Sequence, residues 1–388
     1  MRHHRLLYLF PEPLPLRKAR GVQVVHTVHA FAGQPLDVDL AYVPAEEGTN
    51  PFAAYGMHCP DNVHCIPLSR GLPRPFHRLG IHSGGFFFRR LARWLRKAML
   101  RGTAPDAAMI RHVKLAYRLL KDFPQLPVIY EAHEVFADGA PPAKAGRLAD
   151  IERDVLRRSA VVIAISRQLA DRLRERYGLE REIVVVPSAT NLPETPGNKD
   201  WLHAGQHIVY AGSLYGWKGA QDLVAAACML PGDRITLIGG DSESVAALRR
   251  ELPGGGAEVE FLGHLPHPEA MRRLGTACIA VLPNRAGSVS EFTSPLKLFE
   301  YMAAGCAIVA SDLPVMREIL NEDDASWFTP GDPVSLAAAI RRLTVDPEYA
   351  RRLGQQMRDK ASYHTWEARA TTLYGIVAAL AGRQEEVR

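Results

Sequence analysis

The sequence has 388 residues, 47% hydrophobic and 23% charged, so it is long enough for two globular domains and too apolar for a disordered chain. Its 47 basic and 42 acidic residues give a formal charge of +5, which suits an anionic small molecule or membrane surface but is too weak to indicate nucleic acid. No run approaches the ~20 apolar residues of a membrane-spanning helix. We expect a cytoplasmic protein, with peripheral contact at the inner face of the cytoplasmic membrane.

Short apolar runs alternate with amphipathic stretches through the first half of the chain. Strands are predicted at 6–10, 38–43, 63–67, 107–110, 128–130, 161–165 and 183–186, and helices at 20–31 and 166–177. Strands rich in Val, Ile and Ala are typical of a parallel sheet that helices cover on both faces. The alternation therefore predicts an α/β doubly wound domain.

A second domain begins after a stretch of linker composition at 191–206. The alternation restarts with strands at 208–210, 235–238, 259–262, 279–282 and 307–310. We predict a Rossmann-like domain over 1–195, a second one over 196–362, and a terminal helix over 363–388 that packs back towards the first domain. Two such domains facing each other would form one cleft, because open α/β sheets bind ligands beyond the carboxyl ends of their strands.

The most informative motif is TSPLKLFEYMAAG at residues 293–305. Ser294 suits a helix N-cap, Pro295 the first helical position and Gly305 the end of the helix. The free N–H groups and the dipole at the start of such a helix form an anion site.

Two charged residues lie within this helix. Lys297 occupies the first turn, where a cation is disfavoured unless an anion is bound. Glu300 follows three residues later and can accept two hydrogen bonds from the vicinal hydroxyls of a ribose. A capped surface helix with a Lys297–Glu300 ion pair fits the same spacing equally well.

The second motif is YAGSLYGWKG at residues 210–219, directly after the first strand of the second domain. Gly212 and its neighbouring glycines allow the backbone to approach a ligand closely, and Lys218 offers a point charge to a phosphate. The spacing matches neither G-x-G-x-x-G nor G-x-x-x-x-G-K-[ST], so alone it fits an ordinary strand-to-helix turn as well. Together, the two motifs place two phosphate-seeking elements at one edge of the second domain.

These two segments resemble the donor-site motifs of the GT-B glycosyltransferases, specifically the retaining family 4. That family shows a G-[R/S]-L-x-x-x-K-G loop and an [SP]-x-x-K-L-x-E-[AY]-M-A-x-G helix. YEAHE at 130–134, IAIS at 163–166 and the segment 363–369 are similar to further motifs of the family. The resemblance implies two Rossmann-like domains facing across a cleft.

The resemblance also implies the activity and the site. It implies a retaining, metal-independent transfer of a sugar from a UDP- or GDP-sugar to a hydroxyl of a glycan or lipid-linked acceptor, with no other cofactor. His133 should contact the transferred sugar, Lys218 the diphosphate and Glu300 the ribose. Glu291 is a further catalytic residue, in the place of the family's first glutamate. Donor contacts fall on Gly21, Val22, Gly212, Ser213, Ser294, Pro295, Leu296 and Lys297. The pairs His58-Cys59 and His64-Cys65 lack the usual zinc spacing, so we assign no metal site.

The sequence departs from the family pattern at three places. Ser213 stands where many members have arginine, and only Gly21 remains of the N-terminal glycine pair. The family separates two glutamates by seven residues, but counting back from Glu300 gives Phe292, with Glu291 one place earlier. These departures leave open a sugar-nucleotide epimerase on the same fold or a non-catalytic sugar-nucleotide-binding protein. A third alternative, an NAD-dependent oxidoreductase, is disfavoured because LIGGD at 237–241 lacks the third glycine.

A basic amphipathic helix is predicted at 86–101, where no acidic residue occurs. Its charge comes from six basic residues, and Trp94 belongs to an apolar stripe: the six are Arg89, Arg90, Arg93, Arg96, Lys97 and Arg101. This pattern is typical of an interfacial helix on an anionic leaflet, and would suit a lipid-linked or envelope acceptor. A packed helix with a solvated basic face is the alternative interpretation.

Overall fold

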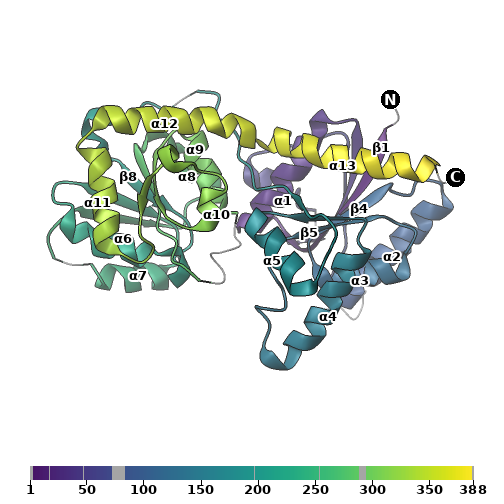
Figure 1. Cartoon of the computed structure of the whole chain (residues 1–388). Coiled ribbons are helices and arrows are strands. Elements are labelled where there is room, and N and C mark those ends of the chain that lie inside the picture. The colour runs from purple at the N-terminus through teal and green to yellow at the C-terminus, as the bar shows by residue number, and fades with distance from the viewer. Residues whose placement is uncertain are drawn as a thin grey trace. The chain divides into compact units, whose positions relative to one another are not determined.

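The computed structural model describes residues 3–16, 18–46, 48–71, 84–195, 197–252, 254–287 and 294–386. The chain forms two compact units (Figure 1). Unit 1 comprises Met1–Ile165, Leu169–Val186 and Trp366–Arg388, and unit 2 comprises Ser166–Gln168 and Pro187–Thr365. Each unit contains one parallel sheet with helices, which confirms the predicted α/β class.

The sheet of unit 1 has seven strands in the order β3-β2-β1-β4-β5-β6-β7, and its paired strands are parallel. They are β1 (His4–Leu14), β2 (Leu36–Pro44), β3 (Val63–Pro67), β4 (Ala107–Ile110), β5 (Val128–Ala132), β6 (Val161–Ala164) and β7 (Val184–Val185). The strand order reverses between β1 and β4. The carboxyl ends of these two strands are therefore the place where a doubly wound sheet binds ligands.

The helices of unit 1 come from both ends of the chain. They are α1 (Ala19–Ala30), α2 (Gly84–Leu100), α3 (Val113–Asp122), α4 (Pro142–Arg158), most of α5 (Arg167–Tyr177) and α13 (Trp366–Glu386). The terminal helix α13 packs on α1 (Figure 1), where the Trp366 ring stacks on His26 with 5.6 Å between ring centroids. The last helix of the sequence thus completes the unit that the first strand begins.

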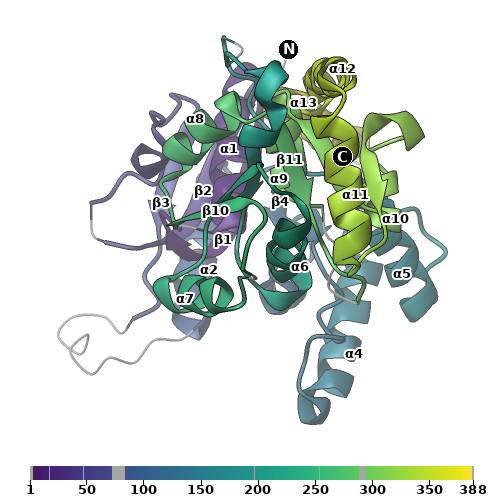
Figure 2. The ribbon, with the colours of Figure 1, turned by 90° about the vertical axis from the view of Figure 1, so that its left-hand side faces the viewer.

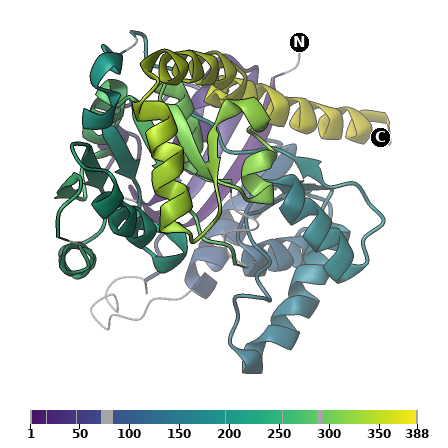
Figure 3. The same cartoon turned by 60° about the vertical axis from the view of Figure 1, so that its left-hand side comes forward.

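The sheet of unit 2 has six parallel strands in the order β10-β9-β8-β11-β12-β13. They are β8 (Ile208–Ala211), β9 (Arg234–Ile238), β10 (Glu258–Gly263), β11 (Ile279–Leu282), β12 (Ala307–Ser311) and β13 (Ser326–Phe328). The helices are α6 (Ala220–Ala226), α7 (Ser242–Arg250), α8 (His267–Thr276), α9 (Leu296–Ala303), α10 (Pro314–Arg317), α11 (Pro333–Thr344) and α12 (Pro347–Ala361). Figures 2 and 3 show these elements from two further directions. Here the strand order reverses between β8 and β11.

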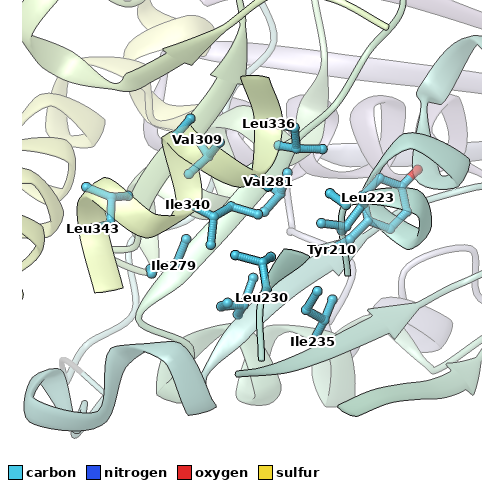
Figure 4. Packing of buried hydrophobic residues seen from close by; sticks show 14 of the residues in the cluster. Tyr210, Leu223, Leu230, Ile235, Ile279, Val281, Val309, Leu336, Ile340 and Leu343 are labelled. Atoms are coloured by element: carbon cyan, nitrogen blue, oxygen red, sulfur yellow. The ribbon is translucent and has the colours of Figure 1, made fainter. Parts of the chain in front are cut away.

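The core of unit 2 lies on both faces of its sheet. Ile279 and Val281 pack in one cluster, with Tyr210, on the face that α6 and α11 cover (Figure 4). Ala280 and Leu282 pack in the other cluster, which includes residues of α9. Successive strand residues alternate between the faces, so all four side chains of β11 are fully buried. The polar side chains that could bind a ligand therefore lie in the loops at the strand ends.

Candidate active site

The glycine-containing loop after β8 is anchored at its start and at its end. Gly212 and Ser213 follow the strand directly, and the Tyr210 hydroxyl donates a 2.6 Å hydrogen bond to the Ser213 carbonyl. Gly219 has a φ of 71°, and a Cβ atom there would clash with the Pro283 carbonyl. The loops after β8 and β11 therefore meet at the strand pair where the order reverses, and Gly219 permits this close approach.

Helix α9 begins one residue later than the sequence predicted. Pro295 is its N-cap and no side chain caps it. The hydroxyl of Ser294 instead accepts a 3.0 Å hydrogen bond from the Ser188 N–H, so the expected Ser294 cap is wrong. Among the described residues, the N–H groups of Leu296 and Lys297 have no acceptor. The helix therefore begins with unsatisfied donors, as an anion site requires.

The other end and the middle of α9 are fixed by contacts that the sequence signals. Gly305 follows the helix with a φ of 66°, which confirms it as the residue that ends the helix. The Tyr301 hydroxyl accepts a 2.7 Å hydrogen bond from the Ala211 N–H at the end of β8. This bond ties α9 to the strand that carries the glycine-containing loop.

Lys297 is buried against an aromatic ring and not against an acid. Its Nζ lies 4.3 Å from the centroid of the Tyr210 ring and has no hydrogen-bond partner among the described residues. Burial, and secondly the charge of Lys218, hold the pKa of Lys297 well below its usual range. A buried ammonium without a counter-charge is unfavourable, so this position favours an anionic ligand.

Lys218 is the second cation of the same site. Its Nζ lies 3.8 Å from the centroid of the Trp217 ring, and burial lowers the pKa of Lys218 to about 8. No carboxylate of the described residues forms an ion pair with Lys218 or with Lys297. Because the charge of Lys218 acts on Lys297, the two lysines produce a local excess of positive charge at the carboxyl edge of the unit 2 sheet.

Glu300 lies on α9 and contacts α8, with no ion pair to Lys297. Its Oε1 lies 2.9 Å from Nε2 of His267, the first residue of α8. Burial alone would lower the pKa of His267, but the hydrogen bond and charge of Glu300 raise it above its ordinary value. The alternative in which Lys297 and Glu300 form a surface ion pair is therefore wrong.

Two residues after β11 were missed by the sequence reasoning. Asn284 is fully buried, and neither atom of its amide has a hydrogen-bond partner among the described residues. The Arg285 guanidinium donates from Nε to Asp222 at 2.8 Å, which holds this loop to α6. The sequence could have indicated both residues, because polar residues directly after a buried strand lie at the ligand-binding edge of the sheet. Glu291 and Phe292, which follow in the same loop, lie outside the described residues.

Gly21 and Val22 lie in the first turn of α1, not between the first strand and its helix. Gly21 is buried, and a Cβ atom there would clash with the Leu16 carbonyl and lie 2.7 Å from the Tyr55 hydroxyl. Packing within unit 1 therefore explains this glycine. Its expected approach to a phosphate stays a prediction.

His133 directly follows β5 and belongs to a buried polar cluster. Its Nε2 lies 3.2 Å from Oε2 of Glu131, and the Arg369 guanidinium donates to Glu131 Oε1. Burial alone would raise the pKa of Glu131, but His133 and Arg369 hold it well below its usual range. Burial and the charge of Arg111 lower the pKa of His133 to about 4, so the imidazole is neutral near pH 7.

The basic helix α2 directs its apolar face into unit 1. Trp94 is half-buried, and the fully buried apolar residues are Phe87, Phe88, Leu91, Ala92, Leu95 and Ala98. Arg89 and Arg93 are exposed, whereas Arg90 donates to the carbonyls of Ser69 and Gly71 at 2.6 and 3.0 Å. Arg90 therefore has a structural role, and the apolar stripe is not free to enter a bilayer. No helix of the described chain is long and apolar enough to cross a membrane.

Comparison with known families identifies the class of protein to which this fold belongs. The family model "Glycosyltransferase Family 4" matches residues 21–193, and "Glycosyl transferases group 1" matches residues 205–346. Together they span most of the chain. The two doubly wound units have the fold of a GT-B glycosyltransferase. The chain belongs to glycosyltransferase family 4, the group 1 glycosyltransferases.

Individual relatives are distant. Glycogen synthase of Mycobacterium tuberculosis is 26% identical over 295 residues, which cover 71% of this chain and 68% of the relative. Sucrose-phosphate synthase of Thermosynechococcus elongatus has a similar structure, with a TM-score of 0.72 at 19% identity over 98% of this chain and 100% of that one. HepE of Anabaena, solved in complex with UDP-glucose, gives a TM-score of 0.72 at 14% identity over 97% of this chain and 100% of that one. These structures establish the fold.

Proposed function

We propose that the chain transfers a hexose, with retention of configuration, from a nucleoside-diphosphate sugar to a hydroxyl of a glycan or lipid-linked acceptor. The observation that carries this proposal is the pair Lys218 and Lys297, two desolvated lysines without a carboxylate partner among the described residues, beside the uncapped start of α9. A diphosphate is the anion whose charge matches this pair. HepE, which shares the fold, was solved with UDP-glucose, and this supports a UDP-sugar as the first donor to test.

The chemistry follows from stabilisation of the leaving group. The bond between the anomeric carbon and the donor's β-phosphate oxygen breaks, and its electron pair stays on that phosphate. Lys218, Lys297 and the free N–H groups of α9 stabilise the resulting charge. We infer that these groups supply the positive charge that a metal ion supplies in other transferases. The departing phosphate oxygen takes the proton of the acceptor hydroxyl, whose oxygen bonds to the anomeric carbon on the same face, so the configuration is retained.

Glu300 and His133 take the two remaining roles. Glu300 accepts hydrogen bonds from the ribose hydroxyls with the oxygen that His267 does not occupy. His133 contacts the transferred sugar, as the family resemblance implies. The neutral state of its imidazole supports a role as a hydrogen-bonding group and not as a cation.

Contact with an anionic membrane is a separate proposal that depends on charge alone. The exposed Arg89 and Arg93 of α2 support it. Because the apolar face of α2 is packed in unit 1, such contact would be electrostatic and reversible.

The proposed activity is tested by incubating the full chain with UDP- and GDP-sugars, with and without glycan or lipid acceptors. We expect nucleotide release that Lys218→Ala and Glu300→Ala abolish, while circular dichroism shows an unchanged fold. Binding without release would indicate a non-catalytic sugar-nucleotide-binding protein. Formation of a free epimeric sugar would indicate an epimerase, and full activity in both variants would refute the assigned site.

A further inference from the structure

Arg111 occupies the ligand-binding edge of unit 1. It directly follows β4, and β4 neighbours β1 at the point where the strand order reverses. Open α/β sheets bind ligands at this point. The family motifs identified in the sequence do not include Arg111.

The Arg111 guanidinium makes one hydrogen bond in the described structure. Its Nη1 donates to the Gln23 side-chain oxygen at 3.2 Å, and no carboxylate lies within ion-pair distance among the described residues. Burial lowers the pKa of Arg111, which reflects the cost of holding this charge away from water. A guanidinium carries five N–H donors, so most of its hydrogen-bonding capacity is unused.

The nearby carboxylates are already paired with other groups. Glu131 accepts from Arg369 and contacts His133, and Glu12 accepts a 2.7 Å hydrogen bond from Nε of Arg20. Two guanidiniums therefore share Glu131 as their near carboxylate, and Arg111 is the one that does not contact it directly. Counted over the described residues, the cluster carries one uncompensated positive charge.

Arg70 is a second arginine near the carboxyl edge of the same sheet. It follows β3, and its buried Nε has no hydrogen-bond partner among the described residues. Its charge contributes to the lowered pKa of His112, the residue next to Arg111, so the two arginines act on one region.

We propose that Arg111, assisted by Arg70, binds an oxyanion of a substrate, either a phosphate or a carboxylate. Both anions match the planar fork of a guanidinium, which can donate two parallel hydrogen bonds to them. This inference rests on the proposed function for the source of the oxyanion. The source is either an anionic group of the acceptor or the diphosphate of the donor.

The test uses the full chain and inorganic phosphate as the probe. Thermal unfolding is followed while phosphate replaces chloride at constant ionic strength, because a ligand that binds only the folded state raises the unfolding temperature. We expect phosphate to stabilise the wild type, and expect Arg111→Gln and Arg70→Gln to reduce that stabilisation at least about twofold. The matched control is Arg147→Gln, an exposed arginine on α4 that should leave it unchanged.

The ligand-free variants provide a second readout. Arg111→Gln should unfold at the same or a higher temperature than the wild type, because it removes a partly buried charge that forms no ion pair among the described residues. A loss of ligand-free stability in Arg111→Gln but not in Arg147→Gln would assign Arg111 to the fold and overturn the inference. An unchanged phosphate response would overturn it equally.

Two further arms separate this inference from the proposed donor site. Phosphate stabilisation that Lys218→Gln alone eliminates would refute the Arg111 site and leave the donor site standing. Stabilisation that only Arg111→Gln eliminates would support the Arg111 site and count against Lys218.

The UDP affinity, measured by calorimetry, then identifies the source of the oxyanion. A loss of affinity in Arg111→Gln indicates the donor's diphosphate, and an unchanged value indicates an anionic acceptor. Either result supports the oxyanion site.

Discussion

The ammonium of Lys297 lies 4.3 Å from the centre of the Tyr210 ring, and the hydroxyl of the same tyrosine holds the Ser213 carbonyl. One aromatic side chain thus contacts both elements of the candidate site, the start of α9 and the loop after β8. The ring shields the ammonium from water without neutralising it. A favourable cation–π contact offsets only part of the cost of burial, and the rest is available to an anionic ligand.

Substitution of Lys297 by methionine should separate ligand binding from stability. The ligand-free variant should be as stable as the wild type or more stable, because an apolar chain of similar length replaces a buried ammonium that no described residue pairs with. UDP affinity should fall by about two orders of magnitude, as for a lost charge-assisted contact. Urea unfolding and calorimetry measure the two effects, with Lys121→Met at an exposed position of α3 as the control. Unchanged UDP affinity would contradict the role of Lys297.

The binding of UDP should depend on pH through Lys218. The pKa of this lysine in the free protein is about 8, and only the charged form attracts a diphosphate. The dissociation constant should be nearly constant from pH 7 to pH 8 and should rise by about tenfold per unit above that. In Lys218→Arg the guanidinium stays charged, so the rise should become smaller, because of the two lysines only Lys297, whose pKa is also lowered, remains to titrate. Calorimetry over pH 7–9.5 tests this, and superimposable profiles for the two proteins would refute it.

The Glu131–Arg369 contact should contribute strongly to the stability of unit 1. Glu131→Gln leaves Arg369 buried without its carboxylate, which should cost about 3–5 kcal/mol in urea unfolding at pH 7. Because the folded-state pKa of Glu131 is depressed, its stabilisation is present above the unfolded pKa of about 4.3 and is lost as the pH falls below it. The difference between the two proteins should therefore shrink in acid. Glu134→Gln, an exposed neighbour, is the control, and a cost below about 1 kcal/mol would contradict a tight pair.

Association with anionic membranes should depend on Arg89 and Arg93. Each contributes about 1 kcal/mol near a charged surface, so the double change to glutamine should weaken binding to phosphatidylglycerol vesicles about tenfold or more. Binding should also fall with added salt and be absent with neutral vesicles. Sedimentation with vesicles measures this, and Lys144→Gln with Arg147→Gln on α4 is the matched control. Equal loss in both double variants would mean that net charge, and not α2, determines the contact.

The strands were predictable because most of them are buried on both faces. A continuous apolar run such as 279–282 can be recognised from the local sequence alone, and β11 has the predicted bounds. β13 was missed because it is three residues long, which is shorter than the pattern can resolve. The motifs also placed Lys218 and Lys297 at one edge, since parallel strands end together.

The partners of the site residues were not predictable, because they come from distant parts of the sequence. Ser294 has the composition of a cap, but Ser188, 106 residues away, binds its hydroxyl. Glu300 was expected near Lys297, whereas it pairs with His267 on α8. Arg111 belongs to no motif. That it lacks a carboxylate partner among the described residues is visible only when the partners of Glu131 are known. Local propensity identifies which residues could act, and tertiary contacts decide which remain free for a ligand.

The central claim is that a diphosphate binds between Lys218 and the start of α9. A crystal structure of the full chain with UDP, or with whichever nucleotide stabilises the protein most, tests it most directly. We predict that phosphate oxygens of the nucleotide lie within hydrogen-bond distance of the Lys218 and Lys297 ammonium groups and of the Leu296 N–H. A nucleotide bound elsewhere, with both lysines still facing only Trp217 and Tyr210, would contradict it.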